Sequence, residues 1–316
     1  MNLDIKDQYN YIRNNIGTIH RDDVGCLQIT GEDALDLLNR LSTNDLINFD
    51  YSNGSISTVL TTNKGRMIDL LTVVKNSKGY LIICSLRALG KVVEWINFYT
   101  IIEEICIEDI SSKILYFTLV GPNSKNVLQN SGLSEFNSLN IIDSKFNYYD
   151  SVDILIDVEN ENTFTKYLKD LRVSYISNQI YQIIRIQEFI PVFGKEITDK
   201  FNPLEAKLEK YISFNKGCYI GQEVIARLNT YNKVKRVLVK IESEANLSIN
   251  SAEKIIFKNQ EIGIITSYIY NSSTRKYIGL AYIDKNFNLN TINANIGVEN
   301  NIKLIFTRLE SSHHLL

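Results

Sequence analysis

The first 230 residues alternate between short apolar runs and longer stretches in which apolar residues recur at helical spacing. Residues 26–30 place Leu27 and Ile29 on one face, which predicts a strand. Leucines at helical spacing then predict a helix up to about Ser42, with Thr30 as its N-cap. The same two periods predict strands at 55–60, 70–74, 80–84, 114–120 and 153–158, and helices at 86–98, from 123, at 161–171 and at 181–189. Strands and helices mixed in this order indicate an α+β architecture rather than a doubly wound parallel sheet.

The pattern changes after about residue 235, where the helical spacing fades. Runs rich in β-formers, separated by Asn, Ser and Gly turns, predict a small antiparallel barrel or sandwich from strands at 237–241, 262–266, 277–283 and 303–306. We therefore expect two domains, residues 1–232 and 233–316. The irregular stretch 191–203 precedes this boundary and holds two of the three prolines, and loops of this length are usually functional.

Composition removes several classes of function. The chain has 316 residues with 34 Lys and Arg against 36 Asp and Glu, a net charge of −2, so we expect neither direct nucleic-acid binding nor membrane binding. Two of the three histidines, His313 and His314, lie at the C-terminal end, which leaves His20 alone in the body of the chain. This nearly excludes zinc sites built on clustered histidines, and a Ser-His-Asp triad would depend on His20 alone.

The cysteine pattern also argues against a metal site. The four cysteines show no C-x-x-C spacing; they are Cys26, Cys84, Cys106 and Cys218. Four free thiols in a chain of this length fit a reducing compartment. The N-terminus carries acidic residues where a targeting peptide would be basic, and no run approaches the roughly 20 apolar residues of a membrane span, so we expect a cytoplasmic protein.

One short motif stands out, and its residues are Lys216, Gly217, Cys218, Tyr219, Ile220, Gly221, Gln222 and Glu223. The two glycines allow backbone angles that other residues resist. If a helix begins near Gly221, the Cys218 thiol lies beside its positive end and two residues from Lys216, and both neighbours would favour the thiolate. The alternative is a small buried cysteine at a glycine-kinked junction, because free cysteine is among the most buried residue types.

This motif, extended to Ala226 and Arg227, resembles the signature of the YgfZ family of folate-binding proteins. That family is related to the glycine cleavage T-protein and to mitochondrial iron–sulfur assembly factors. Residues 41–46, 62–69 and 185–191 resemble further segments of the same superfamily in the same order. The resemblance implies a ring of α/β modules around a central tetrahydrofolate pocket, a C-terminal antiparallel β-barrel, and a monomer.

The resemblance also suggests the folate-binding residues, which would be Asp69, Arg185, Gln187 and Arg227. T-proteins carry two adjacent acids where this chain has Asp69 followed by Leu70. They carry a glutamate, expected at the pterin edge, where this chain has Gln187, which cannot supply a charged acceptor. These departures make ordinary aminomethyl transfer less favoured and leave folate binding in place.

The function implied is a tetrahydrofolate-binding protein that supports assembly or repair of iron–sulfur clusters in client enzymes, with an indirect effect on tRNA modification. Its partners would be folate and iron–sulfur client or assembly proteins, with Cys218 as the working thiol and Lys216 as its electrostatic neighbour. The first alternative is a folate-dependent aminomethyl- or methyltransferase in which Asp69 orients the folate. The second is a binding module that folate only stabilises.

Overall fold

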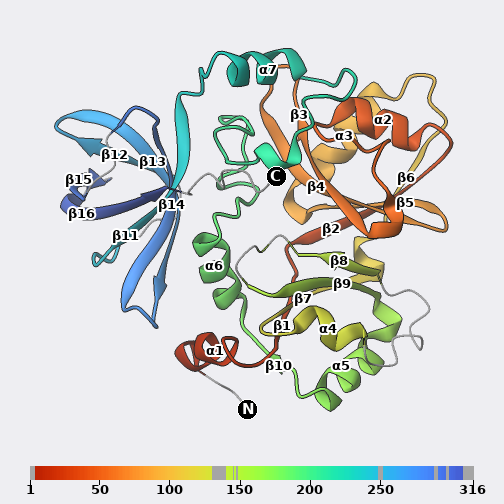
Figure 1. The fold of residues 1–316 in the computed structure, drawn as a ribbon, viewed down its shortest axis with the longest axis horizontal. Coiled ribbons are helices and arrows are strands. Elements are labelled where there is room, and N and C mark those ends of the chain that lie inside the picture. Colours follow the sequence, from red (N-terminus) through yellow and green to blue (C-terminus); the bar gives the residue numbers. More distant parts are fainter. Residues whose placement is uncertain are drawn as a thin grey trace.

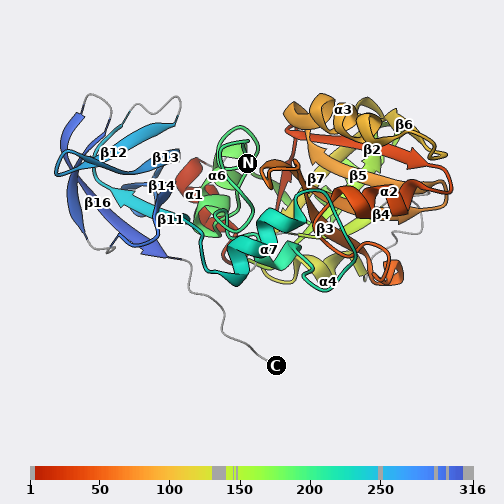
Figure 2. The same ribbon diagram turned by 90° about the horizontal axis from the view of Figure 1, so that it is seen from above.

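A computed structural model describes residues 4–129, 140–144, 146, 149–247, 252–287, 291–296 and 299–308. His313 and His314, and with them the end of the expected second domain, lie outside the described residues. Two five-stranded sheets form one body, and a barrel stands apart at the other end of the molecule, with α1 and α6 between them (Figures 1 and 2).

The first sheet has the strand order β3-β4-β5-β2-β6 with antiparallel neighbours. Its strands are β2 (Val24–Thr30), β3 (Ser55–Thr61), β4 (Met67–Asn76), β5 (Gly79–Ser85) and β6 (Cys106–Asp109). Helices α2 (Ala34–Leu41) and α3 (Leu89–Tyr99) cover one face, and Leu37, Leu38, Val92 and Ile96 bury their apolar stripes there.

The second sheet has the order β10-β1-β7-β9-β8. Its strands are β1 (Gly17–His20), β7 (Ile114–Val120), β8 (Asn140–Asp143), β9 (Ser151–Asp157) and β10 (Ser174–Tyr175). Helix α5 (Glu161–Asp170) packs Phe164 and Leu168 against it, and α4 (Ser124–Gln129) contacts β9. Residues of both sheets, among them Ile83 and Leu155, share one apolar cluster, so the two sheets pack on each other.

The rest of the chain links this body to the barrel. Helices α1 (Ile5–Tyr11) and α6 (Asn178–Gln187) pack together, an irregular stretch follows α6, and α7 (Gln222–Thr230) precedes the barrel. The closed barrel has the order β11-β14-β13-β12-β15-β16. Its strands are β11 (Arg236–Ser243), β12 (Glu253–Phe257), β13 (Gln260–Asn271), β14 (Lys276–Asp284), β15 (Ile292–Ile296) and β16 (Glu299–Arg308). Short 3-10 turns lie at Tyr51–Asn53, Leu86–Ala88, Ser111–Lys113, Val158–Asn160 and Glu209–Tyr211.

The predicted α+β architecture with a C-terminal antiparallel domain is confirmed. Of the two predicted forms of that domain, a barrel or a sandwich, the structure shows the barrel. The N-cap prediction at Thr30 is wrong: Thr30 pairs with Cys106 as the last residue of β2, and α2 begins only after Asp33. The first barrel strand begins at Arg236, and the domain division at residue 232 stays a prediction. No helix of the described residues is long and apolar enough to cross a membrane.

Candidate functional site

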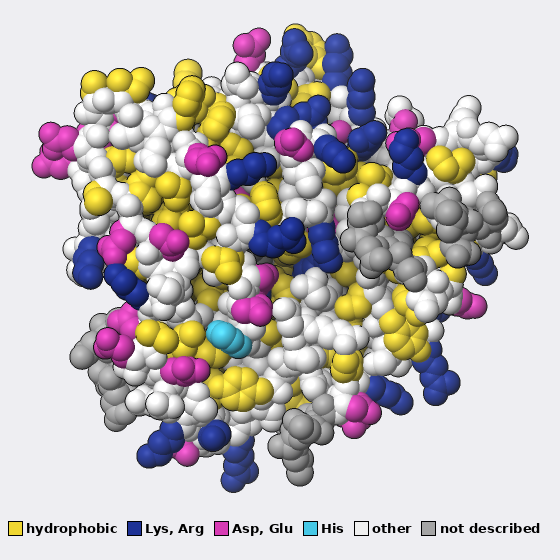
Figure 3. Space-filling model, turned by 180° about the vertical axis from the view of Figure 1, so that it is seen from behind, with side chains coloured by type: hydrophobic (Ala, Val, Ile, Leu, Met, Phe, Trp, Pro, Cys, Tyr) yellow, Lys and Arg dark blue, Asp and Glu magenta, His cyan; other side chains and the backbone are white. Residues whose placement is uncertain are grey.

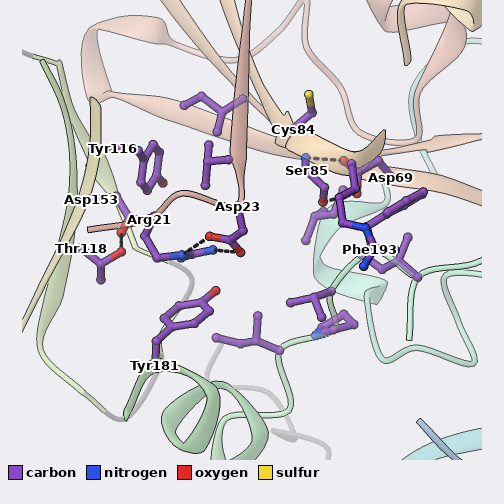
Figure 4. A pocket seen from close by; sticks show the side chains of 18 of the residues that line it. Arg21, Asp23, Asp69, Cys84, Ser85, Tyr116, Thr118, Asp153, Tyr181 and Phe193 are labelled. Carbon is purple, nitrogen blue, oxygen red and sulfur yellow. Dashed lines mark hydrogen bonds and ion pairs between the residues drawn. The ribbon is translucent and has the colours of Figure 1, made fainter. Parts of the chain in front are cut away.

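A cavity of about 210 Å³ opens between the two sheets, α6 and the irregular stretch that follows α6. A single water needs only about 10–15 Å³ by this measure, so the cavity has room for an organic ligand. Figure 4 shows that its polar side chains come from both sheets and from the β1–β2 connection. Its apolar lining includes Leu70, Ile83, Ile190, Val192 and Phe193.

Asp69 on β4 is the most enclosed acid of the cavity, with its side chain fully buried. One carboxylate oxygen accepts a hydrogen bond from the Ser85 backbone N–H at 2.6 Å, and the other accepts one from the Ser85 hydroxyl at 3.0 Å. Ser85 ends β5, the neighbour of β4 in the sheet, so backbone pairing brings donor and acceptor together. The two bonds fix the orientation of the carboxylate at the cavity (Figure 4).

A charged pair lies on the opposite side of the cavity, in the connection between β1 and β2. The Arg21 guanidinium donates to Asp23 through Nε at 2.7 Å and through Nη2 at 2.9 Å, and it stacks 3.6 Å from the centre of the Tyr181 ring. Burial raises the pKa of Asp23, but the hydrogen bond and charge of Arg21 outweigh it and hold this pKa below its usual range. The pair presents a fixed, planar polar surface to a ligand.

A second polar group extends the cavity along β7 and β9. The Thr118 hydroxyl donates to the Asp153 carboxylate at 2.6 Å, and burial together with Asp153 raises the pKa of Tyr116 well above its ordinary value. Arg87 and Lys195 also line the cavity, and burial lowers the pKa of Lys195. The lining thus combines apolar walls with acids and bases at fixed positions, which is typical of ligand sites.

The motif 216–223 lies outside this cavity. The Lys216 ammonium is buried and donates to three backbone carbonyls, those of Asn39 at 2.6 Å, Ser42 at 2.9 Å and Asn44 at 2.6 Å. Burial lowers the pKa of Lys216 to about 8, although the Asp45 carboxylate raises it. Lys216 therefore caps the C-terminal end of α2, and its charge is engaged there rather than at Cys218.

Gly221 explains the second glycine of the motif. Its φ is +87°, it is the N-cap of α7, and a Cβ at this position would lie 2.5 Å from the Thr62 carbonyl oxygen and 3.1 Å from the Gly65 Cα. The motif thus packs against the β3–β4 turn, and the Thr61 hydroxyl donates to the Ile220 carbonyl at 2.7 Å. Gly217 has open space where a Cβ would lie, so neither sterics nor a positive φ requires glycine there.

The other residues of the motif and its helix are placed as follows. Cys218 is exposed and does not line the cavity. Tyr219 is buried, and burial raises its pKa to about 12. Gln222 and Glu223 form the first turn of α7, and Arg227 is exposed in its last turn. The predicted helix start near Gly221 is confirmed. Lys216 and Cys218 are close in sequence, but the Lys216 ammonium bonds to backbone carbonyls and not to the Cys218 thiol.

Of the residues predicted to bind folate, the structure brings only Asp69 into the cavity. Arg185 is fully buried beneath the cavity wall and pairs with Glu196 at 3.3 Å. Gln187 accepts a hydrogen bond from the Tyr9 hydroxyl of α1 at 3.0 Å and does not line the cavity. Among the described residues, no group of three His, Cys, Asp or Glu side chains could hold a metal ion.

No local pattern in the sequence marked several of the cavity residues. Arg21, Asp23, Tyr116, Asp153 and Tyr181 come from four elements and meet only through the packing of two sheets and α6. The adjacent acids at positions 22 and 23 were visible in the sequence, but nothing there indicated that one of them pairs with Arg21.

Two five-stranded α/β sheets with a polar cavity between them and a barrel at the end define a fold that this chain shares with an aminomethyltransferase of known structure. The crystal structure of glycine cleavage system aminomethyltransferase T from Bartonella henselae matches with a TM-score of 0.80 at 15% identity, covering 97% of this chain and 88% of that one. The family model described as the GCVT N-terminal domain matches residues 1–160, half of the 316 residues, and the chain therefore belongs to this family.

Curated relatives agree with this family. An aminomethyltransferase of Caldanaerobacter subterraneus is 26% identical over 304 residues, which are 90% of this chain and 81% of the relative. An aminomethyltransferase of Thermoanaerobacter pseudethanolicus is 22% identical over 308 residues, 90% of this chain and 82% of the relative. The glycine cleavage T-protein superfamily is confirmed for this chain, whereas the narrower resemblance to the YgfZ family stays a prediction.

Proposed function

We propose that this protein is a folate-dependent transferase of aminomethyl or methyl groups that binds tetrahydrofolate in the cavity between its two sheets. The observation that carries the proposal is Asp69, a fully buried carboxylate whose two oxygens are oriented by Ser85 at the edge of an organic-sized cavity. A buried carboxylate held in a fixed orientation at a cleft is a common acid–base group. The names of the relatives support the same reaction class.

The cavity fits the chemistry of a reduced folate. Apolar side chains such as Phe193 and the Tyr181 ring suit a flat pterin, and the carboxylates of Asp69 and Asp153 suit the N–H donors at its edge. Arg87 and Lys195 suit the carboxylates of the glutamate tail. When bound, tetrahydrofolate would supply the nitrogen that carries the one-carbon unit. Asp69 would accept a hydrogen bond or a proton at that end of the cavity.

The iron–sulfur role, its client proteins and its indirect effect on tRNA modification rest on the YgfZ resemblance alone. The relatives named above are aminomethyltransferases, and Cys218 lies outside the cavity, so the transferase is the better supported proposal. A cytoplasmic location and a monomeric state remain part of the same proposal.

Calorimetry with tetrahydrofolate and with 5-formyl-tetrahydrofolate tests this function. Asp69→Asn keeps the shape of the side chain and removes its charge, and it should weaken binding about tenfold or more, the value of one charge-assisted hydrogen bond. Cys218→Ser is the matched control and should bind as the wild type does. A wild type that binds neither folate, or an Asp69→Asn variant that binds as tightly as the wild type, would overturn the proposal.

Turnover separates a transferase from a binding module. The wild type should transfer a one-carbon unit between tetrahydrofolate and a small methyl or aminomethyl donor, and Asp69→Asn should be slower by roughly 10²–10⁴-fold if the carboxylate moves a proton. Tight folate binding with no turnover, unaffected by Asp69→Asn, would favour a scaffold that folate only stabilises.

A further inference from the structure

One wall of the cavity is built from chain without regular secondary structure. Residues 190–197, here called the wall segment, contribute Ile190, Pro191, Val192, Phe193, Lys195 and Ile197 to the lining. Inside the segment, the Gly194 N–H donates to the Ile197 carbonyl and the Ile197 N–H donates to the Val192 carbonyl, both at 3.0 Å. These bonds close a local turn but do not attach the segment to the rest of the molecule.

Glu196 attaches the wall segment to the barrel. It lies between two lining residues, yet its own side chain is fully buried. Its Oε1 accepts from the hydroxyls of Thr266 at 2.7 Å and Ser267 at 2.6 Å on β13, and its backbone carbonyl accepts from the Tyr282 hydroxyl of β14 at 2.9 Å. Its Oε2 turns back and accepts from the N–H of Val192 at 3.1 Å. One carboxylate thus joins two barrel hydroxyls to the backbone of the cavity wall.

Arg185 completes the connection from α6. Its guanidinium is fully buried and donates to Glu196 Oε2 at 3.3 Å and to the Ser267 hydroxyl at 2.7 Å. The same group donates to the Gln182 side chain at 2.5 Å and to the Ile190 carbonyl at 3.3 Å, and both of these residues line the cavity. The four bonds of Arg185 therefore connect a barrel hydroxyl and the Glu196 carboxylate to two residues that line the cavity.

Such a pair is weak evidence for stability. Desolvation offsets much of the attraction between buried charges, and apolar residues of similar volume often replace them without loss. Apolar residues would not make directional hydrogen bonds. The guanidinium and the two carboxylate oxygens do, and these bonds hold Gln182, Ile190 and Val192 at defined positions. We infer that Arg185 and Glu196 are positioning residues through which the barrel fixes the wall of the ligand cavity. Only the effect of this wall on folate binding rests on the proposed function.

Hydrogen–deuterium exchange of the wall segment tests the inference without any ligand. Ser267→Ala removes the hydroxyl that contacts both charges, and amides of 190–197, Val192 above all, should exchange about tenfold faster, as expected for one lost bond. Ser267→Thr keeps a hydroxyl and should restore slow exchange. Tyr268→Phe is the control, because the hydroxyl of the neighbouring Tyr268 donates to the Ala245 carbonyl and interacts with Ser243, both within the barrel chain and away from Glu196.

A double variant, Arg185→Met with Glu196→Met, removes both charges together so that neither is left buried alone. It should keep the thermal midpoint near that of the wild type, exchange fast over 190–197 and bind tetrahydrofolate more weakly. Wild-type exchange over 190–197 in both Ser267→Ala and the double variant would overturn the inference. If the double variant does not fold, the Ser267→Ala and Ser267→Thr comparison decides alone. A wild type that binds no folate would refute the proposed function. The exchange result would then still decide whether Arg185 and Glu196 position the cavity wall.

Discussion

Substituting Lys216 separates two roles for the most distinctive motif of the chain. If Lys216 is the electrostatic neighbour of Cys218, Lys216→Met should alter thiol reactivity and leave the fold unchanged. The structure instead shows the ammonium on the carbonyls of Asn39, Ser42 and Asn44, at the end of α2. We therefore predict that Lys216→Met destabilises the protein.

The size of the loss follows from these contacts. Hydrogen bonds to charged groups contribute about 1.5–3 kcal/mol each. Because the burial that lowers the pKa of Lys216 also penalises its charge, we count the three bonds at the lower bound and take one of them as offset. Lys216→Met should then lower the free energy of unfolding by about 3 kcal/mol, since methionine fills the space but leaves the carbonyls without a donor.

Urea unfolding followed by circular dichroism measures this loss, with Lys64→Met as the control at an exposed lysine of the β3–β4 turn. The pH profile of Cys218 alkylation, measured in a Cys106→Ser background, reports the other role. An unchanged urea midpoint in Lys216→Met together with a shifted alkylation profile would refute the capping role and restore the electrostatic one.

Two further changes test the junction and the cavity. Gly221→Ala should lower the free energy of unfolding by about 3 kcal/mol, because alanine is strained at φ +87° and its Cβ would lie 2.5 Å from the Thr62 carbonyl oxygen. Gly217→Ala should change the free energy of unfolding by less than about 0.5 kcal/mol, because a Cβ there meets open space. Equal urea midpoints for the two variants would contradict this prediction. Arg21 lowers the pKa of Asp23, so the ion pair stabilises the folded state at pH values above 3.8, the usual pKa of an aspartate. This stabilisation is lost as the pH falls below 3.8 and the Asp23 carboxylate becomes protonated. Thermal midpoints of wild type and Arg21→Met should therefore differ at pH 7 and converge under acid conditions, and a difference that persists in acid would contradict the pairing.

Most of the regular elements could be predicted because their signals are local. The placement of Leu27 and Ile29 on one face of β2 and the leucine stripe of α2 are each contained in fewer than a dozen residues. The N-cap at Thr30 was predicted from the same local rules and failed, because pairing with Cys106 keeps Thr30 in β2. Strand pairing across 76 residues is a tertiary effect that no window around Thr30 contains.

The site was predictable only where a motif marked it. Asp69 was found through its resemblance to a family segment, and it does lie in the cavity. Arg185 and Gln187 were found the same way, but the structure places them on Glu196 and Tyr9. A family motif fixes a position along a helix; which side of the helix faces the ligand depends on what packs against the other side, here the barrel and α1.

The motif 216–223 still has a connection to the cavity, although none of its side chains lines it. Gly221 packs on Gly65 in the β3–β4 turn, and the strand that leaves this turn carries Asp69 four residues later. Lys216 fixes the start of the motif to α2, and Gly221 fixes its end to the turn. A larger residue at Gly221 must displace the turn, and because β4 is continuous from the turn to the cavity, this displacement is transmitted to Asp69. We therefore predict that Gly221→Ala weakens folate binding even where Cys218→Ser does not.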